Sequence, residues 1–138
     1  MEFLRENIII TRICAMEGDS STRRLFVPLA SEPFRWFTEG QKQWELRKYG
    51  RQYTERHVWV GRRIELRRGY SSKESLWGVI METVHTANVR DFFGKVNYKI
   101  VIPAAQSEVE AIEMAERILG ISSGTDIPVL GFRVEIEI

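Results

Sequence analysis

The chain has 138 residues, 43% of them hydrophobic, which is enough for a single domain with a real core. Its formal net charge is +1, and Cys14 is its only cysteine, which excludes an intrachain disulfide and a cysteine-based zinc site. No apolar run reaches the ~18 residues of a membrane span, and Glu2 and Glu6 do not fit a signal peptide. We therefore expect a cytoplasmic protein with no membrane partner.

The charge is unevenly distributed along the chain. Residues 41–73 hold ten Lys or Arg and three Glu, a local charge of +7, whereas the remainder carries −6. Such a segment attracts anions, although solvated arginines on exposed strands would give the same count. The sequence contains no phosphate-loop or dinucleotide-type glycine motif, which argues against nucleotide triphosphatases and Rossmann folds. With two distant histidines, His57 and His85, we predict no metal site and no cofactor.

The chain begins with two predicted strands. Residues 7–14 are rich in β-branched side chains, which favour a strand. The segment from Arg24 to Leu29 also reads as a strand, because Leu25, Val27 and Leu29 alternate with Phe26 and Pro28. Pro28 favours an edge position because proline cannot donate a ladder hydrogen bond.

A short helix is predicted next. Ser31 is a suitable N-cap, and Gly40 supplies the left-handed residue that ends the helix. Phe34 and Phe37 lie three residues apart, so they share one face and should anchor the helix to the core.

After Gly40 the period changes from helical to alternating. Glu45 and Arg47 then lie on one side of a strand and Trp44 and Leu46 on the other. We expect the apolar side to face the core. The charged side chains, together with Lys42, would gather at the mouth of a cleft.

The segment from Lys48 to Arg56 is predicted to be a loop beside this cleft. It interleaves basic and aromatic residues, of which Arg51, Tyr53 and Arg56 are candidates for contacting a nucleic acid. A guanidinium neutralises phosphate, and an aromatic ring stacks on a base for ~1–3 kcal/mol. The alternative is a tyrosine-anchored loop with solvated arginines.

The second half of the chain contains four further strands, a helical turn and a helix. We predict strands at 63–68, 76–85, 96–102 and 129–138, the last with a bulge at Gly131. A helical turn at 88–93, capped by Asn88, lies between the second and third of these strands. A helix from 107 to 119, opened by the capping box of Ser107 and Glu110, lies between the third and fourth. The helix is expected to bury Val109, Ile112, Ala115, Ile118 and Leu119 and to expose Glu108, Glu113 and Glu116.

Glu82 stands out on the strand at 76–85, which is otherwise apolar on both faces. Its carboxylate lies either at an exposed edge or in a pocket. In a pocket, burial would raise its pKa and make it a candidate acid or base.

These elements indicate an α+β fold that is mostly β, with six or seven strands and two or three short helices. The absence of βαβ alternation argues against a doubly wound sheet, and a mixed β-barrel topology is implied only by the family resemblance that follows.

The pattern Gly40-x-Lys42-x-x-Glu45-x-Arg47, preceded by the amphipathic helix and followed by the glycine-started strand at 60–66, resembles the ASCH domain. ASCH denotes activating signal cointegrator homology, a module of the PUA-like β-barrel superfamily. The resemblance covers about residues 24–138 of a single domain, 1–138, with the strand at 7–14 as an addition. It implies a PUA-like barrel that holds RNA or a nucleotide beside the motif through Lys42, Glu45 and Arg47. DNA is the less favoured partner.

The same resemblance implies an alternative function, a metal-independent hydrolase acting on acylated nucleosides or on RNA. In that case Lys42 would be the catalytic base. Glu45 stands where the amidohydrolases place a threonine nucleophile, so it could act as a base but not as that nucleophile. Glu82 is then the candidate for the later catalytic glutamate.

Overall fold

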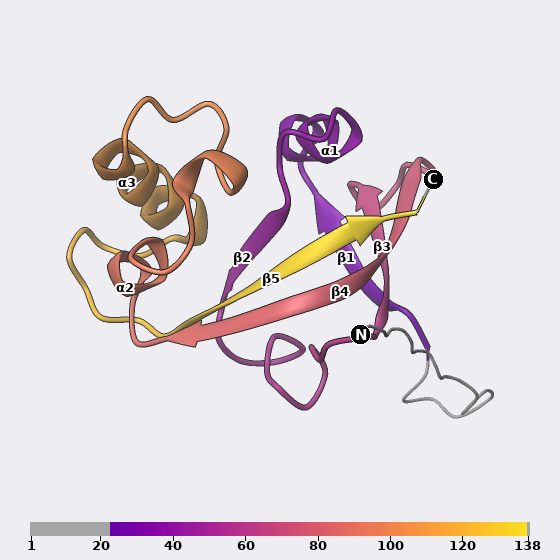
Figure 1. Cartoon of the computed structure of the whole chain (residues 1–138), viewed down its shortest axis with the longest axis horizontal. Helices are drawn as coiled ribbons and strands as arrows, with labels where there is room; N and C mark the ends of the chain where they lie inside the picture. The colour runs from indigo at the N-terminus through magenta and orange to yellow at the C-terminus, as the bar shows by residue number, and fades with distance from the viewer. Residues whose placement is uncertain (1–22, 138) are drawn as a thin grey trace, which may run out of the picture.

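The structure, a computed structural model, describes residues 23–137 and shows a curled five-stranded sheet with helices packed at its side and its end (Figure 1). The strands are β1 (Leu25–Leu29), β2 (Trp44–Lys48), β3 (Arg63–Arg68), β4 (Ser75–Thr86) and β5 (Val129–Ile136). They lie in the order β1-β3-β4-β5-β2, so that β1 and β2 form the two edges. The pair β1–β3 is parallel, and the other neighbours are antiparallel.

This half-barrel confirms the prediction of an α+β fold that is mostly β. The described residues contain five strands, fewer than the predicted six or seven. The predicted strand at 7–14 and Cys14 lie outside the described residues. Among residues 23–137, no helix is long and apolar enough to cross a membrane.

The helices are α1 (Ser31–Thr38), α2 (Val89–Phe93), α3 (Glu108–Leu119) and the 3-10 helix η2 (Tyr98–Ile100). The prediction of a strand at 96–102 is wrong, because this segment forms η2 and the turns around it. The Asn97 side chain accepts a hydrogen bond from the Lys99 amide, which fixes a turn in place of an extended chain. Val101 and Ile102 are nevertheless buried, since the segment packs against α2 and α3.

Two hydrophobic clusters lie on opposite sides of the sheet. One fills the concave side beneath α1 and includes Phe34, Phe37 and Phe132. The other lies between the sheet and the pair α2 and α3, and includes Trp44, Leu46 and Phe92. Strand β2 therefore has packed side chains on both faces.

Helix α1 agrees with the prediction except at its start. Phe34 and Phe37 are buried, and Gly40 has a φ of 78°, as the left-handed stop requires. The predicted cap is wrong, because Ser31 is the first helical residue and the N-cap is Ala30, which has no side-chain cap.

Helix α3 is capped as predicted, since the Ser107 hydroxyl accepts a hydrogen bond from the Glu110 amide. Its buried face was predicted in part wrongly. Val109 and Ile118 are 66% and 69% exposed, whereas Glu116 is only 4% exposed. Relative to the predicted orientation, the helix is rotated so that the small residues Ala111 and Ala115 face the core. The buried Glu116 accepts a hydrogen bond from the Gly124 amide and pairs with Arg90.

Gly131 does not mark a bulge in β5, contrary to the prediction. The irregularity of the sheet lies in β4, between Ile80 and Glu82. Gly131 is instead required by packing, because a Cβ atom at this position would lie 2.2 Å from the ring of Phe92. The glycine makes room for an aromatic side chain of α2.

Candidate functional site

The candidate site is formed where α1, the motif strand β2 and helix α3 meet. The turn after α1 is tight, because the amides of Gln41 and Lys42 both donate to the Trp36 carbonyl. Lys42 therefore enters directly below the helix. Trp44 and Leu46 then face α2 and α3, while Glu45 lies opposite Phe132 on the concave side of the sheet.

Lys42 is a buried lysine with an exposed fraction of 6%. Its Nζ donates to the Val101 carbonyl at 2.6 Å and lies 3.4 Å from Oε1 of Glu45. The ammonium group also sits 5.5 Å from the centre of the Phe37 ring. Burial lowers the Lys42 pKa from its ordinary 10.5, and this outweighs the opposite effect of the Glu45 carboxylate.

Glu45 connects the two cations of the motif. Its exposed fraction is 8%, so the expectation that it lies at an open mouth is wrong. One carboxylate oxygen faces Lys42, and the other accepts a hydrogen bond from Nε of Arg47 at 2.7 Å. The carboxylate is buried because β2 is covered on its concave side as well as on its apolar side.

Arg47 bridges the two edges of the sheet. Besides Glu45, its guanidinium donates to the Tyr53 hydroxyl at 2.9 Å and to the Pro28 carbonyl of β1 at 2.8 Å. The Tyr53 ring lies 5.1 Å from the guanidinium carbon. Because β1 and β2 do not pair, this side chain closes the open side of the half-barrel.

A small cavity lies beside Lys42 and Glu45. Its volume is about 70 Å³, and apart from these two charged side chains it is lined by Pro33, Trp36, Leu46, Val101, Ile102, Ala115, Ile118 and Leu119. At ~10–15 Å³ for one water, it has room for about five waters. Two of the three motif side chains, Lys42 and Glu45, therefore line this hollow, whereas Arg47 does not.

An open groove of about 520 Å³ lies beside the cavity and shares Ile118 and Leu119 with it. The opposite wall of the groove is formed by Arg47, Lys48, Tyr49, Gly50, Arg51 and Tyr53. We call the cavity and the groove together the β2–α3 cleft.

The predicted loop residues lie at different places around this cleft. Arg51 is exposed, has a φ of 53°, and lines the groove together with the half-buried Tyr53. Arg56 is exposed on the same loop and does not line the groove.

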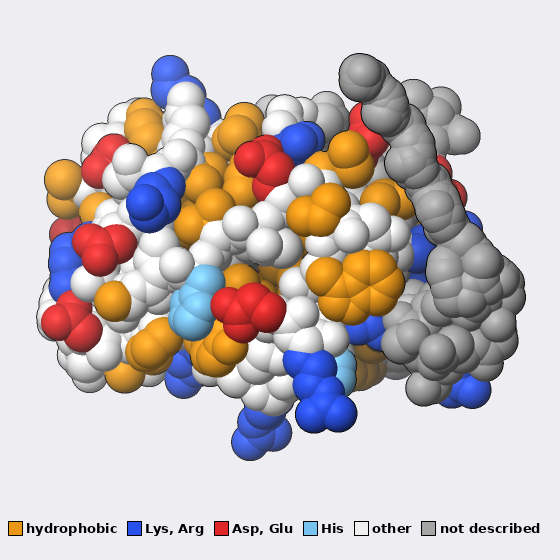
Figure 2. Space-filling model, turned by 60° about the horizontal axis from the view of Figure 1, so that its bottom comes forward, with side chains coloured by type: hydrophobic (Ala, Val, Ile, Leu, Met, Phe, Trp, Pro, Cys, Tyr) orange, Lys and Arg blue, Asp and Glu red, His pale blue; other side chains and the backbone are white. Residues whose placement is uncertain are grey.

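A cluster that sequence reasoning missed fastens this loop to the end of β4. The Glu55 carboxylate accepts a hydrogen bond from the Tyr49 hydroxyl and lies 2.9 Å from Nδ1 of His85. The Tyr49 and His85 rings stack at 4.0 Å with an interplanar angle of 4°. Figure 2 shows the face at this end of the molecule, where side chains of both charges stand among hydrophobic ones and several Lys or Arg project from the lower edge. The sequence did not indicate this cluster, because 30 residues separate Glu55 from His85.

Glu82 does not belong to the cleft. Its side chain is 55% exposed and forms an ion pair with Nε of Arg133 at 2.5 Å. Of the two alternatives considered for it, the pocket is wrong and the exposed position is correct. Glu82 does not line the cavity beside Lys42, which removes its geometric basis as a catalytic partner. Within residues 23–137, no group of three or more His, Cys, Asp or Glu side chains could hold a metal ion.

The burial of Lys42 predicts a pH dependence of stability. Its pKa is lower in the folded protein than in the unfolded chain, so folding disfavours the ammonium. This cost is fully present below the folded pKa and disappears as pH rises toward 10.5. The unfolding free energy of the native protein, measured by denaturant titration, should therefore increase over this window relative to that of Lys42→Met. A constant difference between the two proteins across the window would contradict the assignment.

Solved structures of other proteins share this fold at low sequence identity. Hypothetical protein PH0355 aligns with 83% of this chain and 100% of its own, with a TM-score of 0.65 and 16% identity. Protein PF0455 from Pyrococcus furiosus has a TM-score of 0.57 and 18% identity, covering 83% and 97% of the two chains. ASCH from Zymomonas mobilis has a TM-score of 0.54 and 15% identity, covering 80% of this chain and 65% of its own. No family model and no curated protein sequence matches the chain.

These similarities show a fold of the ASCH type. They confirm the fold that the motif from Gly40 to Arg47 predicted. They concern the arrangement of the backbone, so the binding of RNA and the hydrolase activity stay predictions.

Proposed function

We propose that this ASCH-type domain binds RNA or a nucleotide in the β2–α3 cleft, with one base in the cavity beside Lys42 and Glu45. The observation that carries the proposal is a buried ion pair that borders an otherwise apolar cavity. Buried charged groups are costly, and folding disfavours the charge on Lys42. Their position at a cavity wall is what a ligand site requires, since a few convergent polar groups then fix the orientation of an apolar ring.

The chemistry of the two side chains fits the edge of a base. A lysine ammonium has three donors, of which one is directed to Val101 and another faces Glu45. The third is available for a ring nitrogen or a carbonyl oxygen of a base. The Glu45 carboxylate can accept from an exocyclic amine, and Trp36 and Leu46 supply apolar walls for the ring.

The groove provides the contacts for the backbone of the ligand. Lys48 and Arg51 line it and carry positive charge, and Arg56 would extend the track beyond it. Tyr53 offers an aromatic face at the groove wall. Arg47 uses Nε and both terminal nitrogens inside the protein, so we assign it the role of holding Glu45 and Tyr53 in place.

The test is the binding of a fluorescein-labelled single-stranded RNA of about 12 nucleotides, a length chosen from known site sizes of ~4–16 nucleotides. Fluorescence anisotropy should show an affinity that falls steeply with salt concentration, because phosphate contacts release counterions. Lys42→Met should weaken binding at least about tenfold, the effect of losing one good base contact. Lys95→Ala is the charge-matched control, because Lys95 follows α2 and does not line the cleft.

Two results would contradict the proposal. One is RNA binding that Lys42→Met and Lys95→Ala leave equally unchanged. The other is the absence of binding at low salt for a protein that unfolds cooperatively. DNA of the same sequence, used as a competitor, decides between the two nucleic acids.

A hydrolase is the second candidate, and the lowered pKa of Lys42 favours it. A lysine whose neutral form is more accessible can act as a general base, and Glu45 lies next to it. Incubation with RNA or with an acylated nucleoside, followed by chromatography, separates the two functions. Product formed by the native protein and not by Lys42→Met would support the hydrolase. Intact substrate after binding would support a binding domain.

A further inference from the structure

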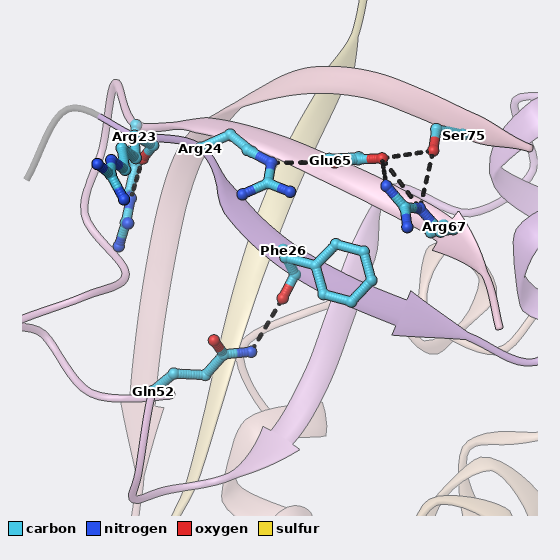
Figure 3. A network of polar contacts seen from close by, with 8 residues as sticks. Arg23, Arg24, Phe26, Gln52, Glu65, Arg67 and Ser75 are labelled. Atoms are coloured by element: carbon cyan, nitrogen blue, oxygen red, sulfur yellow. Dashed lines mark hydrogen bonds and ion pairs between the residues drawn. The ribbon is translucent and has the colours of Figure 1, made fainter. Parts of the chain in front are cut away.

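A second polar network lies on the outer face of the sheet, away from the cavity (Figure 3). At its centre is Glu65 of β3, whose exposed fraction is 3%. Its carboxylate accepts hydrogen bonds from Nε of Arg24 at 3.0 Å, from Arg67 at 2.6 Å and from the Ser75 hydroxyl at 2.6 Å. The two guanidinium groups are thereby held in fixed positions on the surface.

An aromatic ring lies between these guanidinium groups. Phe26 of β1 is aligned with Glu65 in the β1–β3 ladder. Its ring centre is 4.8 Å from the guanidinium carbon of Arg67 and 5.7 Å from that of Arg24. Tyr70, in the turn after β3, follows at a ring distance of 6.1 Å and is 78% exposed. We call Arg24, Phe26, Arg67 and Tyr70 the stacking surface.

The charge of this region favours an anionic partner. Residues 62–74, which span β3 and the turn to β4, contain five Lys or Arg and two Glu, a net charge of +3, and two of these arginines, Arg63 and Arg68, pair with Glu137 and Glu74. Glu65 compensates only part of the charge of the arginines that it orients. A guanidinium that is fixed beside an aromatic ring presents both a phosphate donor and a flat face for a base.

The stacking surface is continuous with the β2–α3 cleft. Arg47 and Gln52, which belong to the cleft strand and its loop, donate to the carbonyls of Pro28 and Phe26 on the edge of β1. The Phe26 and Tyr70 rings lie next to each other beside this edge of β1.

We propose that the stacking surface is a second contact for single-stranded nucleic acid, on which the nucleotides flanking the base in the cleft stack between Tyr70, Phe26 and the two arginines. The inference rests on the proposed function for the identity of the ligand. It predicts that affinity depends on the length of the strand, because a single nucleotide occupies the cleft alone.

The experiment compares Tyr70→Ala, Tyr70→Phe and Lys42→Met in binding an RNA of about 12 nucleotides and a mononucleotide. Tyr70→Ala should weaken the binding of the long RNA about tenfold, within the range for loss of one stacked base. It should leave the mononucleotide affinity unchanged. Tyr70→Phe keeps the ring and should retain the native affinity. Lys42→Met should weaken both ligands. Tyr70 is exposed, so thermal unfolding should show that the fold of both variants is intact.

The outcomes separate this inference from the proposed function. If Tyr70→Ala binds the long RNA as tightly as the native protein, the proposed role of the stacking surface is wrong and the proposed binding in the cleft is unaffected. If Tyr70→Ala weakens the binding of the long RNA and Lys42→Met does not, the role of the stacking surface is supported and the proposed binding in the cleft is wrong. Equal competition by an acidic polyglutamate peptide would overturn the assignment to nucleic acid. Absence of RNA binding by the native protein would overturn both.

Discussion

Replacing Arg47 by alanine should lower the free energy of unfolding by about 3–5 kcal/mol, the range for breaking a buried ion pair on one side. The substitution removes three hydrogen bonds at once, to Glu45, Tyr53 and Pro28. It leaves the buried Glu45 carboxylate with Lys42 alone, and it opens the connection between β1 and β2. Denaturant unfolding followed by circular dichroism measures the effect.

Two further variants make this prediction specific. Arg47→Lys should recover little of the loss, because an ammonium cannot reproduce the planar donors that reach three partners. Arg35→Ala is the control, since Arg35 is 54% exposed and, among residues 23–137, pairs with exposed glutamates of its own helix and its end. Its loss should be about 0–1 kcal/mol. Equal destabilisation by Arg35→Ala and Arg47→Ala would show that Arg47 does not hold the edges of the sheet together.

The second large effect is expected for Gly131→Ala. The added methyl group would lie 2.2 Å from one atom of the Phe92 ring and 2.6 Å from another. Phe92 is fully buried between α2 and the sheet, so the ring has no free space to enter. We expect a loss of about 3 kcal/mol, at the upper end of the usual range for overpacking. Thermal or denaturant unfolding measures it.

A double-mutant cycle identifies the cause of this loss. Phe92→Leu removes ring atoms that the new methyl group would meet, so the double variant should lose clearly less stability than the sum of the two single variants. Additive losses would mean that Gly131 is required for a reason other than the ring of Phe92.

The sequence predicted best those elements that are specified by neighbouring residues. The α2 turn is one example, since the Asn88 side chain caps it by accepting a hydrogen bond from the Asp91 amide, three residues on. Strand β3 is another, because its alternation of apolar and charged residues matches the observed bounds, Arg63–Arg68. The failure at 96–102 has a physical reason. An alternating apolar pattern is compatible with a buried turn as well as with a strand, because α2 and α3 cover the apolar side chains of this turn.

The grouping of the motif residues could be predicted from the sequence, but their burial could not. The motif placed Lys42, Glu45 and Arg47 together, and the structure confirms that they are in contact. The burial of Glu45 depends on packing from both sides of β2, which no local pattern encodes. Glu65 illustrates the same limit. In the sequence it is one charged residue of an exposed strand face, and only the folded chain brings Arg24 to it across 41 residues.

The central claim is that the cavity beside Lys42 receives a base, and the indole resonances of the four tryptophans test it most directly. Trp36 lines the cavity, whereas Trp59 lies in the loop between β2 and β3. In two-dimensional nuclear magnetic resonance spectra, titration with adenosine or uridine monophosphate should shift the Trp36 indole signal and leave Trp59 in place. Lys42→Met should abolish the shift. A nucleotide that binds while the Trp36 signal stays unmoved would contradict the account.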